Sequence, residues 1–213
     1  MPGGSAEYRR EVLKSGQYRG VLFDFDGTLT KPFFDWMRMR DEMGFETDLD
    51  ILDYLSRAEG AERSRVEEIL FRHEAAASEG AELAEGVEPV LGLLASRSVP
   101  VGIVTNNTYP NVEPVLERFG LEFRAVVTRD IGVWKPDPRQ VEAGCRALGL
   151  PASRVIFIGD GRYDMMAGRE AGTLNIGLLN TTRKRTEFIR LCDHAVENLH
   201  EAIPLLEGLL AKE

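Results

Sequence analysis

The chain has 213 residues, a hydrophobic content of 43%, a charged content of 29% and a formal net charge of −9 at pH 7, values typical of a globular protein with one substantial core or a core carrying a small insertion. The negative charge argues against a nucleic-acid partner, no run reaches the roughly 18 apolar residues of a membrane helix, and the polar residues 1–20 lack the apolar centre of a signal peptide. We therefore expect a cytoplasmic protein without nucleic-acid or membrane partners, and the sequence leaves its oligomeric state open.

The first predicted elements are a short helix near residues 7–14 and a buried strand over 20–23. Residues 21–30, Val-Leu-Phe-Asp-Phe-Asp-Gly-Thr-Leu-Thr, begin as a buried parallel strand and break into a tight loop. Asp24 and Asp26 can therefore point into the crevice where open α/β sheets bind ligands. Two carboxylates buried there need a cation or a shared proton. For an isolated Asp-x-Asp, a loop capped by its own aspartates is an equal alternative.

Residues 31–85 carry apolar side chains at helical spacing and contain no strand-like run. This pattern predicts a helical insertion after the first strand, and Asp48 is the expected N-cap of its middle helix. We therefore predict a core domain of residues 1–31 and 86–213, with an all-α domain of residues 32–85 inserted into it.

Strands and helices alternate in the rest of the chain. The predicted strands cover residues 99–104, 123–127, 155–158, 174–178 and 195–196. The predicted helices cover residues 87–97, 111–119, 137–148, 163–171 and 199–210. Strand–helix units of this length predict an α/β fold, a Rossmann-like doubly wound parallel sheet with helices on both faces.

Two polar stretches follow at the expected carboxyl edge of the sheet. Thr105, Asn106 and Asn107 end a strand, and a hydroxyl and exposed backbone amides there can hold phosphate oxygens without adding charge, although a plain turn is the commoner explanation. Lys135 precedes a proline and therefore lies in extended backbone just before a helix. A lysine fixed there can neutralise a phosphoryl group, whereas a solvated loop lysine is the alternative.

A third stretch, Ile-Gly-Asp-Gly-Arg-Tyr-Asp at residues 158–164, adds two carboxylates. We expect Asp160 at the cap of the next helix and Asp164 one turn in, on the same side; helix capping alone is the alternative. With Asp24 and Asp26, these aspartates would line one sheet edge. Carboxylates without Cys or His favour Mg²⁺ over zinc.

The histidines and cysteines are scattered through the chain and form no recognisable ligand pattern. We interpret each of them as a surface or packing residue. They are His73, His194, His200, Cys145 and Cys192.

Four stretches occur in order: Asp-Phe-Asp-Gly-Thr-Leu-Thr, Val-Thr-Asn, Lys-Pro-Asp-Pro and Ile-Gly-Asp-Gly-Arg-Tyr-Asp. They resemble the four motifs of the haloacid dehalogenase-like hydrolase superfamily. The last two, with Ala-Leu-Gly-Leu-Pro and Met-Met-Ala-Gly-Arg-Glu-Ala-Gly after them, resemble its phosphoglycolate phosphatase-like branch. The resemblance covers residues 20 to about 180.

This resemblance implies a two-step phosphoryl transfer to water. Asp24 would be the nucleophile that forms an aspartyl-phosphate, and Asp26 would protonate the leaving group and then deprotonate water. Thr105 and the backbone amide of Asn106 would bind the phosphoryl oxygens. Lys135 would offset charge between the nucleophile and the phosphoryl group.

The resemblance also implies a Mg²⁺ site. Asp24, Asp160 and the backbone carbonyl of Asp26 would hold the ion, and Asp164 would support it directly or through water. Mg²⁺ and lysine together would allow a carboxylate to attack a phosphate dianion that repels it.

The insertion resembles the helical caps of this superfamily, which close over the site and admit a small substrate. Phe33, Phe34, Trp36 and Arg38 follow the acidic loop and are candidates for the entrance, although packing within the cap is the commoner role for Trp36. Arg38 and Arg40 are candidates for a second anionic group of the substrate, and a solvated helix face is the alternative for each.

The function expected is a phosphatase that hydrolyses a small phosphorylated metabolite, with a hexose phosphomutase as the alternative. Haloacid dehalogenation is disfavoured by Asp26 and Asp160, which that chemistry does not use. A phosphonate hydrolase needs a cap lysine, and residues 32–85 contain none. A non-catalytic protein that binds a phosphorylated metabolite is a further alternative.

Overall fold

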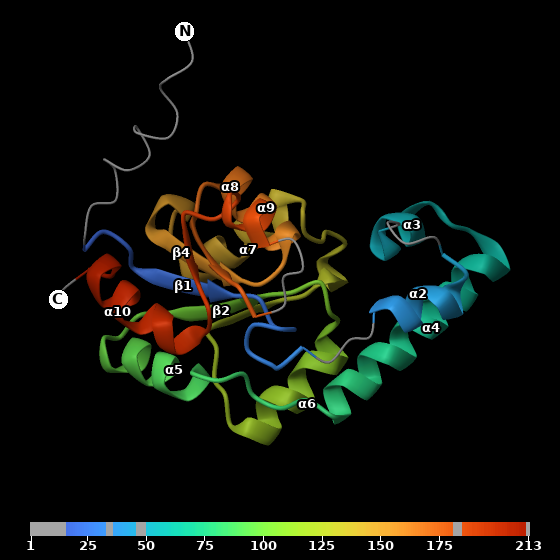
Figure 1. Cartoon of the computed structure of the whole chain (residues 1–213), viewed down its shortest axis with the longest axis horizontal. Helices are drawn as coiled ribbons and strands as arrows, with labels where there is room; N and C mark the ends of the chain where they lie inside the picture. Colours follow the sequence, from blue (N-terminus) through green and yellow to red (C-terminus); the bar gives the residue numbers. More distant parts are fainter. Residues whose placement is uncertain (1–15, 33–35, 46–49, 181–184, 212–213) are drawn as a thin grey trace, which may run out of the picture.

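The computed structural model describes residues 16–32, 36–45, 50–180 and 185–211. These ranges form a six-stranded sheet in which every neighbouring pair of strands is parallel (Figure 1). The strands are β1 (Gly20–Phe23), β2 (Val101–Val104), β3 (Ala125–Val127), β4 (Val155–Gly159), β5 (Leu174–Leu178) and β6 (His194–Val196). The predicted α/β class and parallel sheet are confirmed.

The strand order is β3-β2-β1-β4-β5-β6, so the first strand lies in the middle of the sheet. Phe23 at the end of β1 pairs with Ile103 of β2 and with Ile158 of β4. The chain therefore leaves β1, β2 and β4 at nearly the same level of one sheet edge. An order that runs outward in both directions from β1 creates a crevice at the carboxyl ends of these strands.

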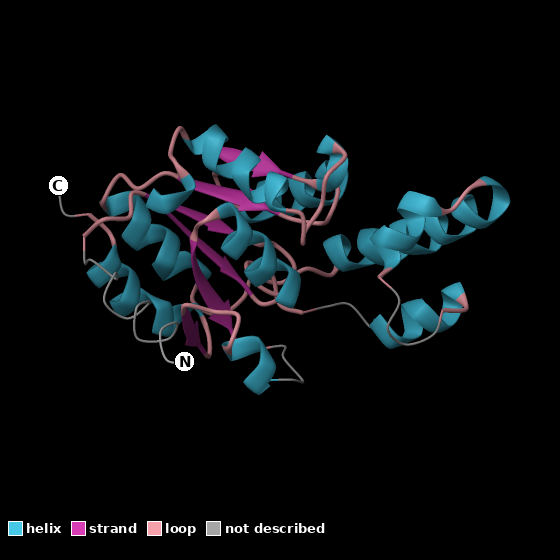
Figure 2. Ribbon diagram, turned by 90° about the horizontal axis from the view of Figure 1, so that it is seen from above, coloured by secondary structure: helices cyan, strands magenta, loops and turns pink. Residues whose placement is uncertain are grey.

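Helices cover both faces of the sheet (Figures 1 and 2). Val21 and Phe23 contribute to the apolar layer under α5 (Val87–Ser96), α6 (Tyr109–Phe119) and α10 (Leu199–Leu209). Leu22 between them points to the opposite layer, under α7 (Pro138–Leu148) and α8 (Arg162–Ala171). This alternation is the period of two that a strand imposes on its side chains. The remaining short helices are α9 (Arg185–Ile189), η1 (Arg129–Ile131) and η2 (Ala152–Arg154).

Two predicted strands, over residues 99–104 and 123–127, begin two residues later in the structure, and for the first of them the cause is the turn that ends α5. The Val99 amide bonds back to the carbonyl of Leu94, and Ser98 has the left-handed φ of 52° that commonly ends a helix. Val99 therefore belongs to the helix terminus, and β2 begins only at Val101.

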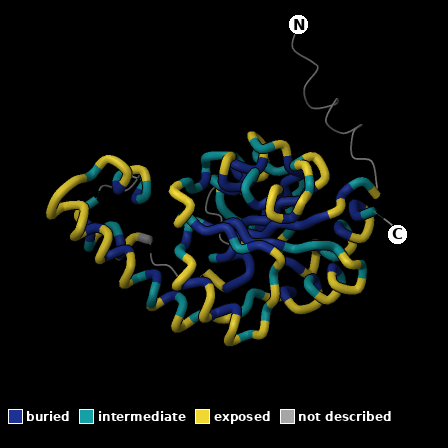
Figure 3. Tube along the Cα trace, turned by 180° about the vertical axis from the view of Figure 1, so that it is seen from behind, coloured by how far each residue is buried: buried dark blue, intermediate teal, exposed yellow. Residues whose placement is uncertain are grey.

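The insertion between β1 and α5 is helical, as predicted, with α2 (Trp36–Met43), α3 (Ile51–Arg57) and the long α4 (Gly60–Glu79). These helices enclose a separate apolar cluster that includes Met39, Leu55 and Val66, and their outer faces are exposed (Figure 3). None of the described helices is long and apolar enough to cross a membrane.

The middle helix of the insertion begins later than predicted. Its N-cap is Asp50, whose side chain accepts a hydrogen bond from the Asp53 amide at 2.8 Å. An N-cap carboxylate must lie two or three residues before the amide that it accepts, which excludes Asp48 from this role.

Several predictions fall on segments that the structure does not describe. They concern the proposed helix at residues 7–14, Phe33, Phe34 and the side chain of Trp36.

Candidate active site

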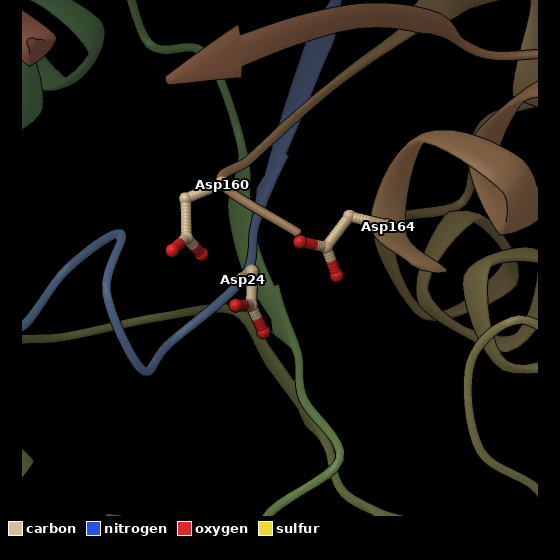
Figure 4. A group of neighbouring side chains, drawn as sticks. All are labelled: Asp24, Asp160 and Asp164. Carbon is tan, nitrogen blue, oxygen red and sulfur yellow. The ribbon is translucent and has the colours of Figure 1, made fainter. Parts of the chain in front are cut away.

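Three aspartates converge at the carboxyl edge of the sheet. Asp24 follows β1, Asp160 follows β4, and Asp164 lies in the first turn of α8. One oxygen from each carboxylate lies within 4.8 Å of the others, and Figure 4 shows the three side chains gathered close together. Because β1 and β4 are neighbours, residues far apart in the chain meet here.

Lys135 enters this acidic cluster from the loop before α7. Its Nζ lies 2.5 Å from Oδ1 of Asp24 and 2.6 Å from Oδ1 of Asp164, and it donates to the carbonyl of Val104 at 2.9 Å. The lysine is only 2% exposed. A cation held this rigidly between two carboxylates can neutralise negative charge at the position of Asp24.

Asn106 and Gln140 hold the backbone around Lys135. The Asn106 side chain accepts from the Lys135 amide at 2.8 Å and donates to the Lys135 carbonyl at 2.9 Å. Gln140 accepts from the same amide at 3.2 Å and donates to the carbonyl of Thr105 at 2.8 Å. The Asn106 side chain therefore ties two loops together, while the Thr105 hydroxyl accepts from the amide of Asn107 at 3.0 Å.

The two later aspartates have different surroundings. Asp160 accepts from the Thr28 hydroxyl at 3.3 Å, whereas Asp164 accepts from the Gly161 amide at 2.7 Å with its second oxygen. Helix α8 begins at Arg162 with Gly161 as N-cap, so the expectation of Asp160 at the cap was one residue early. Asp164 lies in the first turn of α8, and its carboxylate accepts the hydrogen bond of the Gly161 amide at the N-terminus of that helix.

The loop after β1 approaches Asp160 closely at Gly27. This glycine has a φ of 83°, and a Cβ atom there would lie 2.4 Å from Oδ2 of Asp160. Any larger residue would be strained and would displace the carboxylate.

Asp26 lies in the same loop, but its carboxylate is not part of the three-aspartate group. Its Oδ2 accepts a hydrogen bond from the side-chain amide of Asn107 at 3.0 Å. Burial raises the pKa of Asp26 to about 7 and the Asp24 carboxylate adds to this rise, while the Asn107 hydrogen bond opposes it. A carboxyl group whose pKa lies near neutrality is suited to give up and take back a proton.

Burial and neighbouring charges also shift the titration of the cluster. Burial is the main cause that raises the pKa of Asp24, Asp164 adds to it, and Lys135 opposes it. Burial acts to lower the pKa of Lys135, but Asp164 and Asp24 outweigh it and raise that pKa. When the three aspartates of the cluster and Lys135 are all ionised, two net negative charges remain, which a divalent cation would offset. The oxygen donors and this charge fit Mg²⁺.

Arg38 and Arg40 of the insertion differ from each other in exposure. Arg38 has a side chain that is 73% exposed and pairs with Glu42 at 3.2 Å, as a solvated helix face requires. Arg40 is partly buried, and its Nε has no hydrogen-bond partner. Burial raises the pKa of Tyr163 and Asp50 adds to this rise, while the charges of Arg162 and Arg40 oppose it.

The histidines and cysteines lie outside the group of carboxylates that could hold a metal. His73 pairs with Glu42 at 3.2 Å within the insertion, and Cys145 and Cys192 are free thiols. Burial raises the pKa of Cys145 to about 11, so this cysteine packs as an apolar residue.

Four side chains around the site were missed from the sequence: Asn107, Asn111, Glu74 and Arg129. They form a buried chain of hydrogen bonds that ends on Asp26. Polar residues at helix starts and on helix surfaces are common, and nothing in their spacing distinguishes Asn111, Glu74 and Arg129 from solvated ones. Only Asn107 carried a signal, because it directly follows the Thr105-Asn106 pair.

Comparison with known proteins identifies the family of this arrangement. A model of the haloacid dehalogenase-like hydrolases matches residues 18–172, a range that contains all four strand-end stretches. Among the relatives, a phosphoglycolate phosphatase of Yersinia pseudotuberculosis is 30% identical over 193 residues, covering 78% of this chain and 83% of its own length.

Two further relatives are similar over most of the chain. An N-acetylmuramic acid 6-phosphate phosphatase of Pseudomonas putida is 30% identical over 179 residues, covering 73% of this chain and 80% of its own length. The crystal structure of a hydrolase from Pseudomonas syringae superposes with a TM-score of 0.77 at 21% identity, covering 91% of this chain and 100% of the other. At that identity the superposition shows a shared fold.

Proposed function

The chain belongs to the haloacid dehalogenase-like hydrolases, and from this premise we propose that it is a Mg²⁺-dependent phosphatase of a small phosphate monoester, acting through an aspartyl-phosphate. The observation that carries the proposal is the contact of the buried Lys135 ammonium with Asp24, 2.5 Å apart, beside Asp160 and Asp164. An acidic cluster with one embedded cation is suited to a dianionic phosphoryl group, which bare carboxylates would repel.

In the first step, a carboxylate oxygen of Asp24 attacks the phosphorus, and the bond from phosphorus to the ester oxygen breaks. Asp26 in its acid form gives its proton to that oxygen, so the product leaves as a neutral alcohol. Its pKa of about 7 supports this role, because the acid form is populated at neutral pH.

Thr105 and the amide that follows it are the proposed phosphoryl-binding groups. The Thr105 hydroxyl accepts from the Asn107 amide, so its own hydrogen is directed elsewhere and is suited to a phosphoryl oxygen. For Asn106 the proposal concerns the backbone amide, since its side chain is engaged with Lys135.

In the second step, the Asp26 carboxylate removes a proton from a water molecule, whose oxygen attacks the phosphorus of the aspartyl-phosphate. The bond from phosphorus to the Asp24 oxygen breaks, releasing inorganic phosphate and restoring the carboxylate. Lys135 offsets the charge that returns to Asp24.

Mg²⁺ would be held by Asp24, Asp160 and the backbone carbonyl of Asp26. When bound, it would polarise the phosphoryl group and reduce its repulsion of the nucleophile. We propose that Asp164 mainly orients its neighbours, since its two oxygens already accept from Lys135 and Gly161.

We propose residues 32–85 as a cap over the site, with residues 1–31 and 86–213 as the core domain. The separate apolar cluster of the insertion supports this division, as do the paired connections: the Lys31 amide donates to Glu82, and the Ala84 amide donates to Leu29. A cap that closes over the site would favour a small phosphorylated metabolite as substrate. The phosphoglycolate and N-acetylmuramic acid 6-phosphate phosphatases among the relatives support this substrate class.

The test is phosphate release from p-nitrophenyl phosphate, 2-phosphoglycolate and N-acetylmuramic acid 6-phosphate, in Mg²⁺ and in EDTA. We expect turnover that requires Mg²⁺ and disappears in Asp24→Asn. A wild-type protein that releases phosphate from none of these esters contradicts the proposal. Exchange of phosphate between positions of a hexose would then favour a phosphomutase, and tight binding without turnover a non-catalytic protein.

A further inference from the structure

A chain of hydrogen-bonded side chains connects Asp26 to the insertion helix α4. It runs from Asp26 through Asn107 and Asn111 to Glu74, and ends at Arg129. Glu74 belongs to the insertion, whereas the other members belong to the core. Glu74, Asn107 and Asn111 are each at most 5% exposed, so the chain is built away from water.

Asn107 has only one orientation that fits its neighbours. Its Oδ1 accepts from the Thr108 amide at 2.8 Å and from the side-chain amide of Asn111 at 3.0 Å. Both of those partners are donors, so Oδ1 must face them and Nδ2 must face Asp26, 3.0 Å away. Asn107 therefore presents an obligate donor to the Asp26 carboxylate.

Glu74 fixes the next member of the chain. Its carboxylate accepts two hydrogen bonds from the Arg129 guanidinium, at 2.5 and 2.8 Å. It also accepts one from the Asn111 side-chain amide, at 3.4 Å. Arg129 also donates to the carbonyl of Asn106 at 2.6 Å. The ion pair thus connects the insertion helix both to the Asp26 chain and to the proposed phosphoryl-binding loop.

Contacts other than this ion pair also attach α4 to the core. At the end of α4, Arg118 donates to the backbone carbonyls of Glu79, Ser78 and Ala81, and Ser78 donates to the carbonyl of Asn111 at 2.8 Å. Apolar side chains would pack an already anchored helix at less cost than a buried glutamate. The buried pair therefore needs a role besides docking.

We propose that Asn107 and Glu74 are positioning residues for Asp26, and that the insertion helix thereby helps to orient the proton-transfer group of the core. Glu74 holds Asn111, Asn111 holds the Asn107 amide, and that amide holds the Asp26 carboxylate toward the leaving group. The inference rests on the proposed function, because it assigns the proton transfer to Asp26.

The first experiment separates proton transfer from phosphoryl binding by changing the leaving group. p-Nitrophenolate leaves as a stable anion, whereas the phenolate of phenyl phosphate is more basic and needs the proton. Rapid mixing of Asn107→Ala with phenyl phosphate should show a first turnover slowed by about 10²-fold, the usual contribution of a positioned acid. The first turnover of p-nitrophenyl phosphate should change less than about threefold, and KM for both esters should stay near the wild-type value.

Glu74→Gln is the second variant, because it keeps the side-chain shape and removes the charge. We expect the first turnover of phenyl phosphate to slow by about fivefold, the effect of one weakened hydrogen bond, while that of p-nitrophenyl phosphate stays nearly unchanged. Arg118→Ala is the matched control: it removes an attachment of α4 without touching the Asp26 chain, and both esters should keep their wild-type rates. Equal losses on both esters, a change in KM alone, or the same pattern in Arg118→Ala would overturn the proposal.

A second measurement is independent of turnover. The side-chain amide signal of Asn107 in a ¹⁵N spectrum can be assigned because it disappears in Asn107→Ala. In the wild type and in Arg118→Ala, this amide should exchange its hydrogens more slowly than a solvent-exposed asparagine side chain does. Exchange should accelerate about fivefold in Glu74→Gln. Unchanged exchange in Glu74→Gln would overturn the positioning role, whereas an inactive wild type with the expected exchange pattern would overturn only the proposed function.

Discussion

Ion pairs at the sheet edge and on the insertion helices have the same chemistry in different surroundings. The side chains of Lys135 and Asp24 are 3% and 10% exposed. Arg57 and Asp53 on α3 also lie in contact, 2.8 Å apart, but their side chains are 76% and 53% exposed. In water such pairs contribute about 0–1 kcal/mol to stability, whereas a buried charge must be compensated by its partner.

This difference indicates what each group of charges does. The exposed ion pairs of the insertion lie on the outer faces of helices whose packing comes from their apolar cluster, and they keep those faces solvated. The sheet-edge charges are costly to bury and are kept where they can meet a charged ligand. The buried pair of Glu74 and Arg129 belongs with the second group, although Glu74 lies on an insertion helix.

The largest effect is expected for Asp24→Asn. The amide can still accept from Lys135 but is a far weaker nucleophile, so phosphate release should fall by about 10⁴-fold or more. Turnover of p-nitrophenyl phosphate in Mg²⁺ measures this loss. Asp53→Asn, which changes an exposed carboxylate of α3, is the control and should keep wild-type activity. Residual turnover above a hundredth of wild type would exclude Asp24 as the nucleophile.

Lys135→Met should have the largest effect on stability. It leaves Asp24 and Asp164 buried and facing each other without their shared cation, which should lower the free energy of unfolding by about 3–5 kcal/mol. Urea denaturation in EDTA measures the change. A loss under about 1 kcal/mol, the range of an exposed pair, would show that the sheet-edge pair contributes no more than those of the insertion.

Mg²⁺ should stabilise the protein through the same cluster. At a hundred times its Kd, the ion should raise the free energy of unfolding by about 2.7 kcal/mol. Thermal unfolding with Mg²⁺ and with EDTA measures this difference, which should disappear in Asp160→Asn. Asp41→Asn, at an exposed position of α2, should respond to Mg²⁺ like the wild type. An equal response in Asp160→Asn would mean that the ion binds elsewhere.

The smallest effect is expected for Arg57→Ala on the insertion. The pair with Asp53 spans one helical turn and is exposed, so its loss should cost at most about 0.5 kcal/mol and less at high salt. Urea denaturation at low and high NaCl measures both values. A cost above 2 kcal/mol would mean that the exposed pair shares the energetic role assigned to the sheet edge.

The family and the order of the elements followed from the sequence. The strand at residues 174–178 was predicted with its observed bounds, and three helices end as predicted at residues 119, 148 and 171, where the C-caps are Gly120, Gly149 and Gly172. These predictions succeeded because buried strands and glycine C-caps are local properties, set by neighbouring residues. The family match over residues 18–172 confirms the resemblance that the four motifs indicated.

Local patterns were less reliable where two residues compete for one role. Asp48 and Asp50 are equally good N-cap types, and only the helix geometry selects Asp50, whose carboxylate reaches the amide of Asp53. In the same way, Asp160 and Gly161 both precede α8, and the bond from the Gly161 amide to Asp164 determines the start of the helix.

The site itself divides along the same line. The sequence by itself determined which polar side chains lie at the carboxyl ends of the central strands, because these side chains directly follow β1, β2 and β4 in the chain. Only the tertiary structure decided that Lys135 lies between two of those carboxylates and that Glu74 of the insertion is connected to Asp26. Such contacts join residues that are far apart in the chain, and the free energy that selects them comes from burial and hydrogen bonding in the assembled fold.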